Sequence, residues 1–132
     1  MHRFALLTVL FCGVFVAAAQ DNPWVYRDNP HWDRSWNRRP FPRAGACFFT
    51  DRDFGGNRFC VVRGDRLERL PEDFGDNISS VRLFGGATVN VFNDRHFSGG
   101  ATELVRSVRD LRRVPFRDGH TWNNRISSVI IR

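Results

Sequence analysis

The chain has 132 residues, of which 26% are charged, and its formal net charge is +6. All 20 of its Lys-plus-Arg residues are arginine, and acidic residues are interspersed among them without any nucleobase-stacking motif. The basic surplus therefore indicates a solvated surface that adheres to anionic polymers by summed electrostatics, and not a specific nucleic-acid interface. We expect a single folded domain, because about one domain fits into a chain of this size.

The N-terminal segment is typical of a secretory signal peptide. Arg3 precedes an apolar run over residues 4–19, which ends in three alanines before polarity returns at Gln20. The run is shorter than the roughly 20 residues that span a bilayer. We therefore expect residues 1–19, with Cys12, to be removed, no transmembrane segment to remain, and the protein to be secreted or periplasmic.

The next segment, residues 20–44, is rich in proline, tryptophan and arginine. Neither helical nor strand periodicity is visible in it, and proline opposes regular pairing. We expect a flexible segment. The alternative is an arm in which Trp24, Trp32 and Trp36 dock on the domain or on a partner through stacking and cation–π contacts.

An internal repeat begins after this segment. Residues 49–56 read FTDRDFGG and residues 92–99 read FNDRHFSG, an offset of 43 positions. The sequence Ile-Ser-Ser-Val recurs at 78–81 and 126–129, an offset of 48. Two copies with features in the same order indicate a duplication. The growing offset places about four additional residues in the second copy, between Pro115 and Ile126.

Both copies read as β-structure. Short runs rich in valine, isoleucine and phenylalanine alternate with polar residues, and glycine pairs punctuate them. The expected strands cover residues 47–50, 59–63, 80–84, 89–92 and 128–131. The fold class is therefore predicted to be all-β. Six residues are expected to be largely buried: Phe49, Phe54, Val81, Phe92, Phe97 and Val129.

The two remaining cysteines, Cys47 and Cys60, lie equally far from a predicted turn between Asp53 and Phe54. In a symmetric hairpin they would face each other within reach of a disulfide. A metal-binding or redox pair is the alternative, but the spacing is long and neither cysteine has a nearby histidine. We predict a structural disulfide, which suits a small domain in an oxidising compartment.

Each repeat carries the pattern aromatic-x-x-x-x-aromatic-x-Gly, as Phe49, Phe54, Gly56 and as Phe92, Phe97, Gly99. This pattern resembles the folded hairpin of the βγ-crystallin family, although phenylalanine stands where that family usually has tyrosine at the first position. The resemblance covers about residues 45–132. It implies two tandem Greek keys, at about 45–85 and 87–132, that form a βγ-crystallin-like sandwich.

Microbial members of this family bind calcium through the motif N/D-N/D-x-x-S/T-S. Residues 123–128, Asn-Asn-Arg-Ile-Ser-Ser, match it fully, whereas residues 75–80 match it except at Gly75. The resemblance implies a pair of Ca²⁺ sites built from oxygen ligands, as calcium prefers. The residues assigned by resemblance are hydroxyls of Ser79 and Ser127, carbonyls of Arg52, Asn77, Arg95 and Arg125, and side chains of Asp76 and Asn124.

The alternative is that these residues only cap turns, since Asn, Asp and Ser satisfy backbone groups without a metal. Few carboxylates approach the sites, and Arg125 adds a positive charge. We therefore expect weak binding, at about 10⁻⁵–10⁻³ M.

Enzymatic activity is not expected. The chain has no G-x-S-x-G elbow, and His96 and His120 are too far apart in the sequence for a convincing metal site. We expect a monomeric, non-enzymatic protein with a structural or stress-related role. Its expected partners are the calcium ion and an anionic cell-surface polymer.

The alternative function is a secreted protease inhibitor or toxin-like binder, because small secreted metalloproteinase inhibitors and killer-toxin-like proteins resemble this fold too. In that case residues 116–122 or the Trp-rich segment would supply the contact. Fold by itself does not choose between the two functions.

Overall fold

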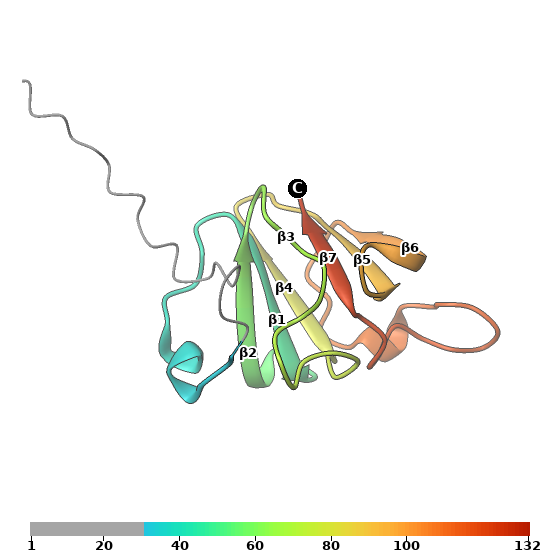
Figure 1. The fold of residues 1–132 in the computed structure, drawn as a ribbon, viewed down its shortest axis with the longest axis horizontal. Coiled ribbons are helices and arrows are strands. Elements are labelled where there is room, and N and C mark those ends of the chain that lie inside the picture. The colour runs from blue at the N-terminus through green and yellow to red at the C-terminus, as the bar shows by residue number, and fades with distance from the viewer. Residues whose placement is uncertain (1–30) are drawn as a thin grey trace, which may run out of the picture.

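The computed structural model describes residues 31–132, which form two facing antiparallel sheets (Figure 1). The first sheet has the order β2-β1-β4, from β1 (Gly45–Asp51), β2 (Gly55–Val62) and β4 (Ser80–Phe84). The second has the order β3-β7-β5-β6, from β3 (Arg66–Leu67), β5 (Val89–Asp94), β6 (Ser98–Leu104) and β7 (Ser128–Ile131). Two short 3-10 helices, η1 (Arg34–Arg38) and η2 (Leu111–Arg113), complete the described part. The all-β prediction is confirmed.

The two repeats exchange their third strands. In the first repeat β3 leaves its own sheet and pairs with β7 of the second repeat, through Leu67 and Val129. In the second repeat Val108 takes the equivalent place and forms a bridge with Val81 of β4. Each sheet is therefore completed by the other repeat, which interlocks the two Greek keys.

The core lies between the sheets and follows the alternation of each strand. Phe48 and Phe59 stack at 4.9 Å between ring centroids and belong to the same buried cluster as Val91 and Val129 of the other sheet. Of the six residues expected in the core, Phe49, Val81 and Val129 are buried. The other three, Phe54, Phe92 and Phe97, are only half-buried, because they pack within the folded hairpins at the rim and not between the sheets.

The predicted disulfide is confirmed. Cys47 and Cys60 are direct partners in the β1–β2 register, with their Cα atoms 4.0 Å apart and their sulfur atoms bonded. Both residues are fully buried.

Residues 31–43 pack against the first sheet, as in the alternative of a docking arm and not as the flexible segment expected there. Trp36 in η1 is 4% exposed. Trp32 donates its indole N–H to the carbonyl of Arg58 at 2.9 Å, and the Arg58 guanidinium donates to the carbonyl of Arg39. Burial under this segment lowers the pKa of Arg58. The expected signal peptide and Trp24 lie outside the described residues.

This docked segment, residues 31–43, covers the outer face of the first sheet. Cys47 and Cys60 belong to that face, since their neighbours Phe48 and Phe59 point to the core. At the equivalent places of the second sheet, 43 positions later, Asn90 is half-buried and Glu103 is exposed. The docked segment therefore turns the outer face of the first sheet into interior.

Candidate cation-binding sites

Each repeat folds its first hairpin back on itself through two consecutive residues with left-handed backbone. Asp53 and Phe54 have φ of 58°, and His96 and Phe97 have φ of 58° and 56°. A glycine stands two residues after each pair. At Gly56 and Gly99 the φ is 75° and 77°, and a Cβ atom would lie 2.3 Å from a polar side-chain atom of the preceding strand. Larger residues are therefore excluded at both positions.

A buried serine holds each folded hairpin on its sheet. Ser80 Oγ accepts from the Phe54 N–H at 3.0 Å and donates to the Asp51 carbonyl at 2.6 Å. Ser128 does the same with Phe97 and Asp94, at 3.0 and 2.6 Å. The second serine of each Ser-Ser pair is thus a brace. The first serine of each pair is left to face the hairpin loop.

At the second hairpin three oxygen atoms converge. Ser127 Oγ lies 2.8 Å from a carboxylate oxygen of Asp76 and 2.9 Å from the carbonyl oxygen of Asn93. A serine hydroxyl has one hydrogen, and both neighbours only accept, so this hydrogen can make a full hydrogen bond to one of the two oxygens but not to both. Such an excess of oxygen atoms fits a cation, and hard oxygen ligands suit Ca²⁺.

The carboxylate in this cluster comes from the other repeat. Asp76 has a φ of 56°, and its N–H donates to the Ile126 carbonyl at 3.1 Å. Asn124, its counterpart in the second repeat, has a φ of 57° and donates to the Ile78 carbonyl at 2.9 Å. Each end loop therefore reaches across to the opposite repeat, so Asp76 meets Ser127 and not its neighbour Ser79.

Other expected ligands surround the same place. Asn124 and Arg125 line a shallow pocket of about 280 Å³ together with Asp76 and Asn93. The Arg95 carbonyl accepts from the Ser98 hydroxyl at 2.7 Å, so it is already engaged within the hairpin. Sequence reasoning missed the Asn93 carbonyl, because the resemblance assigned the ligand of this hairpin to the carbonyl of Arg95, two positions later.

The first hairpin is less suited to a cation. Ser79, Arg52 and Asn123 line a pocket of about 390 Å³ there, but Arg112 lines it as well. Arg112 binds the carboxylate of Asp110 at 2.7–3.2 Å, and this hydrogen bonding lowers the Asp110 pKa to about 2. The carboxylate of Asp110 is therefore already paired with a guanidinium at neutral pH.

The side chain of Asn77 points to neither site, because its amide donates a hydrogen bond to the Asp73 carbonyl at 3.2 Å. Within residues 31–132, no group of three or more His, Cys, Asp or Glu side chains is arranged so that it could hold a metal ion. Any cation bound by this part of the chain would thus rely on hydroxyl and carbonyl oxygens.

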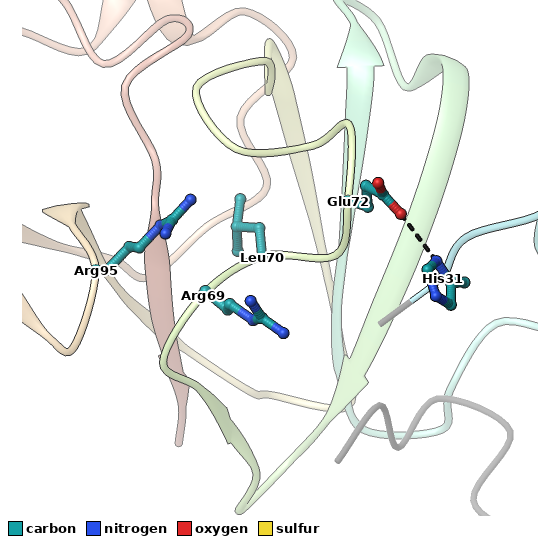
Figure 2. A pocket seen from close by; sticks show the side chains of 5 residues that line it. All are labelled: His31, Arg69, Leu70, Glu72 and Arg95. Carbon is teal, nitrogen blue, oxygen red and sulfur yellow. Dashed lines mark hydrogen bonds and ion pairs between the residues drawn. The ribbon is translucent and has the colours of Figure 1, made fainter. Parts of the chain in front are cut away.

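Beside the second hairpin a further pocket of about 390 Å³ lies between residue 31, the loop after β3 and the hairpin (Figure 2). His31 and Glu72 form one wall, with Nδ1 and a carboxylate oxygen 2.8 Å apart, and Arg69 and Arg95 form the opposite side. The pocket shares these arginines with a neighbouring depression that Asp76 and Ser127 line. Guanidinium groups therefore stand next to the oxygen cluster and weaken its attraction for a cation.

A comparison with known protein families shows to which family this architecture belongs. The family model described as peptidase inhibitor family I36 matches residues 37–105, more than half of the chain. The chain belongs to peptidase inhibitor family I36. The match starts inside η1, so the family's domain includes part of the docked segment as well as the first Greek key.

The solved structures similar to this I36 protein are βγ-crystallin domains, which confirms the predicted fold. One, from work on the evolution of the eye lens βγ-crystallin domain fold, is 25% identical, with a TM-score of 0.57 over 71% of this chain and 91% of its own. A βγ-crystallin from Ciona intestinalis is 24% identical, with a TM-score of 0.53 and coverage of 67% and 99%. The Ca²⁺-bound βγ-crystallin domain of Abundant Perithecial Protein from Neurospora crassa is 17% identical, with a TM-score of 0.54 and coverage of 70% and 92%.

A search of the curated proteins found no match. The families found, a peptidase inhibitor family and βγ-crystallin domains, are not enzyme families. Among residues 31–132, no helix is long and apolar enough to cross a membrane.

Proposed function

We propose that this protein is a secreted peptidase inhibitor that acts by binding its target and catalyses no reaction. The observation that carries the proposal is the match of residues 37–105 to a peptidase inhibitor family. The buried disulfide supports an oxidising compartment, as does the signal peptide expected at residues 1–19. The interlocked sheets supply a rigid scaffold, which lowers the entropic cost of binding.

The test is a titration of serine, cysteine, aspartic and metallopeptidases with the disulfide-bonded protein. We expect saturable inhibition of at least one class with a Kd below about 1 μM, because peptidase–inhibitor interfaces are among the tightest of standard size. The protein should remain intact on an electrophoretic gel during the assay.

The matched control is the same protein after reduction and heat unfolding, which can act only as a competing substrate. The proposal fails if none of the four classes is inhibited at 10 μM, or if the folded protein is digested as quickly as the unfolded control.

A second candidate function is weak calcium binding at the second hairpin, favoured by the convergence of Asp76, Ser127 and Asn93. In this proposal the Asp76 carboxylate, the Ser127 hydroxyl and the Asn93 carbonyl hold the ion, and Asn124 supports the loop. The ion would supply a bridge between the two repeats, since Asp76 and Ser127 lie 51 positions apart in the chain. Its role is then stabilisation, which is compatible with inhibition.

Calcium is therefore expected to raise the melting temperature, and Ser127→Arg is expected to remove more of that gain than Ser79→Arg. Calcium at about 100 times its Kd stabilises a single-site protein by roughly 2.7 kcal/mol. Each kcal/mol shifts the melting temperature of a small domain by about 4–8 °C. The introduced guanidinium stands where the cation would bind, and only the Ser127 site has an Asp carboxylate 2.8 Å from the serine.

The measurement is thermal unfolding with and without millimolar Ca²⁺, with Mg²⁺ as the control ion. Asp76→Asn should abolish most of the gain while keeping the shape of the side chain. If Ca²⁺ and Mg²⁺ shift the wild-type curve equally, the loops are only well-capped turns.

A further inference from the structure

A row of alternating guanidinium groups and phenylalanine rings lies along the outer face of the first sheet. The guanidinium of Arg58 lies 4.1 Å from the ring centroid of Phe41, and the guanidinium of Arg82 lies 5.1 Å from the same centroid. Arg82 also lies 5.8 Å from the ring centroid of Phe54, and Arg109 lies 5.1 Å from that second centroid. These five residues form what we call the arginine–phenylalanine row.

Separate parts of the chain bring the row together. Arg82 is on β4 directly opposite Cys47, so it lies on the outer face of the sheet. Phe41 comes from the docked segment. Arg109 comes from the stretch after β6, where its carbonyl accepts from the Asp53 N–H at 2.7 Å. The arrangement of the row is therefore fixed by tertiary contacts.

The two exposed arginines of the row have unused hydrogen-bond donors. Arg58 is buried, and its guanidinium donates to carbonyls of the docked segment. Arg82 and Arg109 are exposed. Among the contacts within residues 31–132, neither of these two guanidinium groups donates a hydrogen bond or forms a salt bridge. Their N–H groups therefore face solvent and can bind an acceptor that a partner brings.

Carboxylates of this region act on a different arginine. Asp110 and Asp53 both stabilise the charge of Arg112 and raise its pKa, the first mainly through hydrogen bonds to the guanidinium. The positive charges of Arg82 and Arg109 are therefore not paired within the protein. Guanidinium groups bind oxyanions through two parallel hydrogen bonds, which suits a carboxylate or a sulfate group.

The contacts of the rings indicate which anionic polymer fits. Single-stranded nucleic acids bind largely by stacking their bases on free aromatic faces. In the row, Phe41 already stacks on Phe84 at 5.0 Å and Phe54 packs on Phe49 at 5.6 Å, in addition to the guanidinium groups beside each ring. The rings are thus occupied, and the N–H donors remain for binding. This favours a polymer of charged sugars over one with aromatic bases.

We propose that Arg82 and Arg109 form a binding surface for an acidic polysaccharide, whose carboxylate or sulfate groups they bind. Arg58 and the two rings support these guanidinium groups, which lowers the entropic cost of binding. The net charge of +6 attracts such a polymer from a distance. This activity is separate from peptidase inhibition and does not depend on it.

The test compares two double variants of the disulfide-bonded protein, Arg82→Gln/Arg109→Gln and the control Arg66→Gln/Arg117→Gln. Both remove two positive charges from exposed arginines that lie over phenylalanine rings. In the control the rings belong to the second repeat, with Arg66 at 5.5 Å from Phe97 and Arg117 at 4.8 Å from Phe116. Binding is measured for polygalacturonate and dextran sulfate, with neutral dextran as the control polymer.

We expect Arg82→Gln/Arg109→Gln to weaken binding of at least one acidic polymer about tenfold, and the control variant to weaken it less than about threefold. A difference between the two polymers identifies the preferred oxyanion. Added salt should weaken wild-type binding more than binding of the first variant, because two exposed charge contacts are missing there. Neutral dextran should not bind. Arg109→Gln alone leaves the contacts of Phe41 intact and should weaken binding about threefold, which tests the surface even if the double variant is unstable.

Three results would overturn the proposal. Equal losses in the two double variants would mean that net charge alone holds the polymer. Absence of binding to both acidic polymers at low ionic strength would mean that the row has only a structural role. A DNA oligonucleotide that binds more tightly than both polysaccharides, with the same loss in Arg82→Gln/Arg109→Gln, would assign the surface to nucleic acid.

Discussion

Replacing Trp36 with alanine is expected to destabilise the domain by about 3–5 kcal/mol, the usual cost of removing a buried aromatic side chain. Trp36 is 4% exposed, and its carbonyl accepts from the Arg58 guanidinium at 3.5 Å. Loss of the indole ring would loosen the docked segment from β2 and leave the largely buried Arg58 without its cover. Thermal unfolding followed by circular dichroism measures the effect.

Phe41→Ala is the matched control within the same segment, because that ring is 42% exposed although it stacks on Phe84 at 5.0 Å. Its smaller loss of buried area should cost less than half as much. In native protein, Trp36→Ala should also let a small thiol reductant reach the Cys47–Cys60 bond faster, since the docked segment covers that face. If Trp36→Ala melts at the wild-type temperature, residues 31–43 do not stabilise the domain.

Replacing both Cys47 and Cys60 with alanine is expected to lower the free energy of unfolding by about 3 kcal/mol. The bond closes a loop with a sequence separation of 13, and the chain-entropy model assigns about this value to loops of that length. Each kcal/mol shifts the melting temperature of a domain of this size by about 4–8 °C. Because both positions are fully buried, alanine is preferable to serine, which would bury an extra hydroxyl.

Calorimetric unfolding of the double variant measures this loss. The wild-type protein unfolded and refolded in the presence of a reductant is the independent comparison, and it should lose stability in the same direction. A decrease in melting temperature of less than about 4 °C would contradict the entropic account and would mean that the β1–β2 hairpin is as constrained without the bond as with it.

The Trp36→Ala variant and the double cysteine variant both affect the first sheet. The disulfide ties β1 to β2 within the sheet, and Trp36 holds the segment that covers both cysteines. Both variants therefore test the stability of the first sheet, one from within the sheet and the other from the segment that covers it.

Patterns within short segments of the sequence were sufficient to predict the fold. The repeated aromatic-x-x-x-x-aromatic-x-Gly motif predicted two folded hairpins, and both exist with left-handed residues at the same two positions. The equal distance of Cys47 and Cys60 from the first turn predicted their bond, because register in a tight hairpin follows directly from chain position. The same alternation predicted the buried inner-face residues Val81 and Val129.

The motif Asn/Asp-Asn/Asp-x-x-Ser-Ser located the end loops, but not their partners. From the sequence, the complete motif at 123–128 was expected to form a better calcium site than the incomplete motif at 75–80, with each motif supplying its own ligands. In the structure each motif is divided: Ser127 shares its cluster with Asp76 of the incomplete motif, and the first hairpin instead receives a paired carboxylate at Asp110. The preference for Ser127 therefore has a different reason, the carboxylate beside it.

What the sequence determined by itself is everything that depends on neighbours along the chain: strand alternation, the folded hairpins, the disulfide and the duplication. The tertiary structure alone decided three other matters. These are the exchange of third strands between sheets, the meeting of Asp76 with Ser127, and the docking of residues 31–43 over the outer face of β1 and β2. All three bring together residues that are far apart in the chain. The free energy of these contacts comes from burying surfaces on both partners at once, so a pattern within one segment does not identify the segment that it meets.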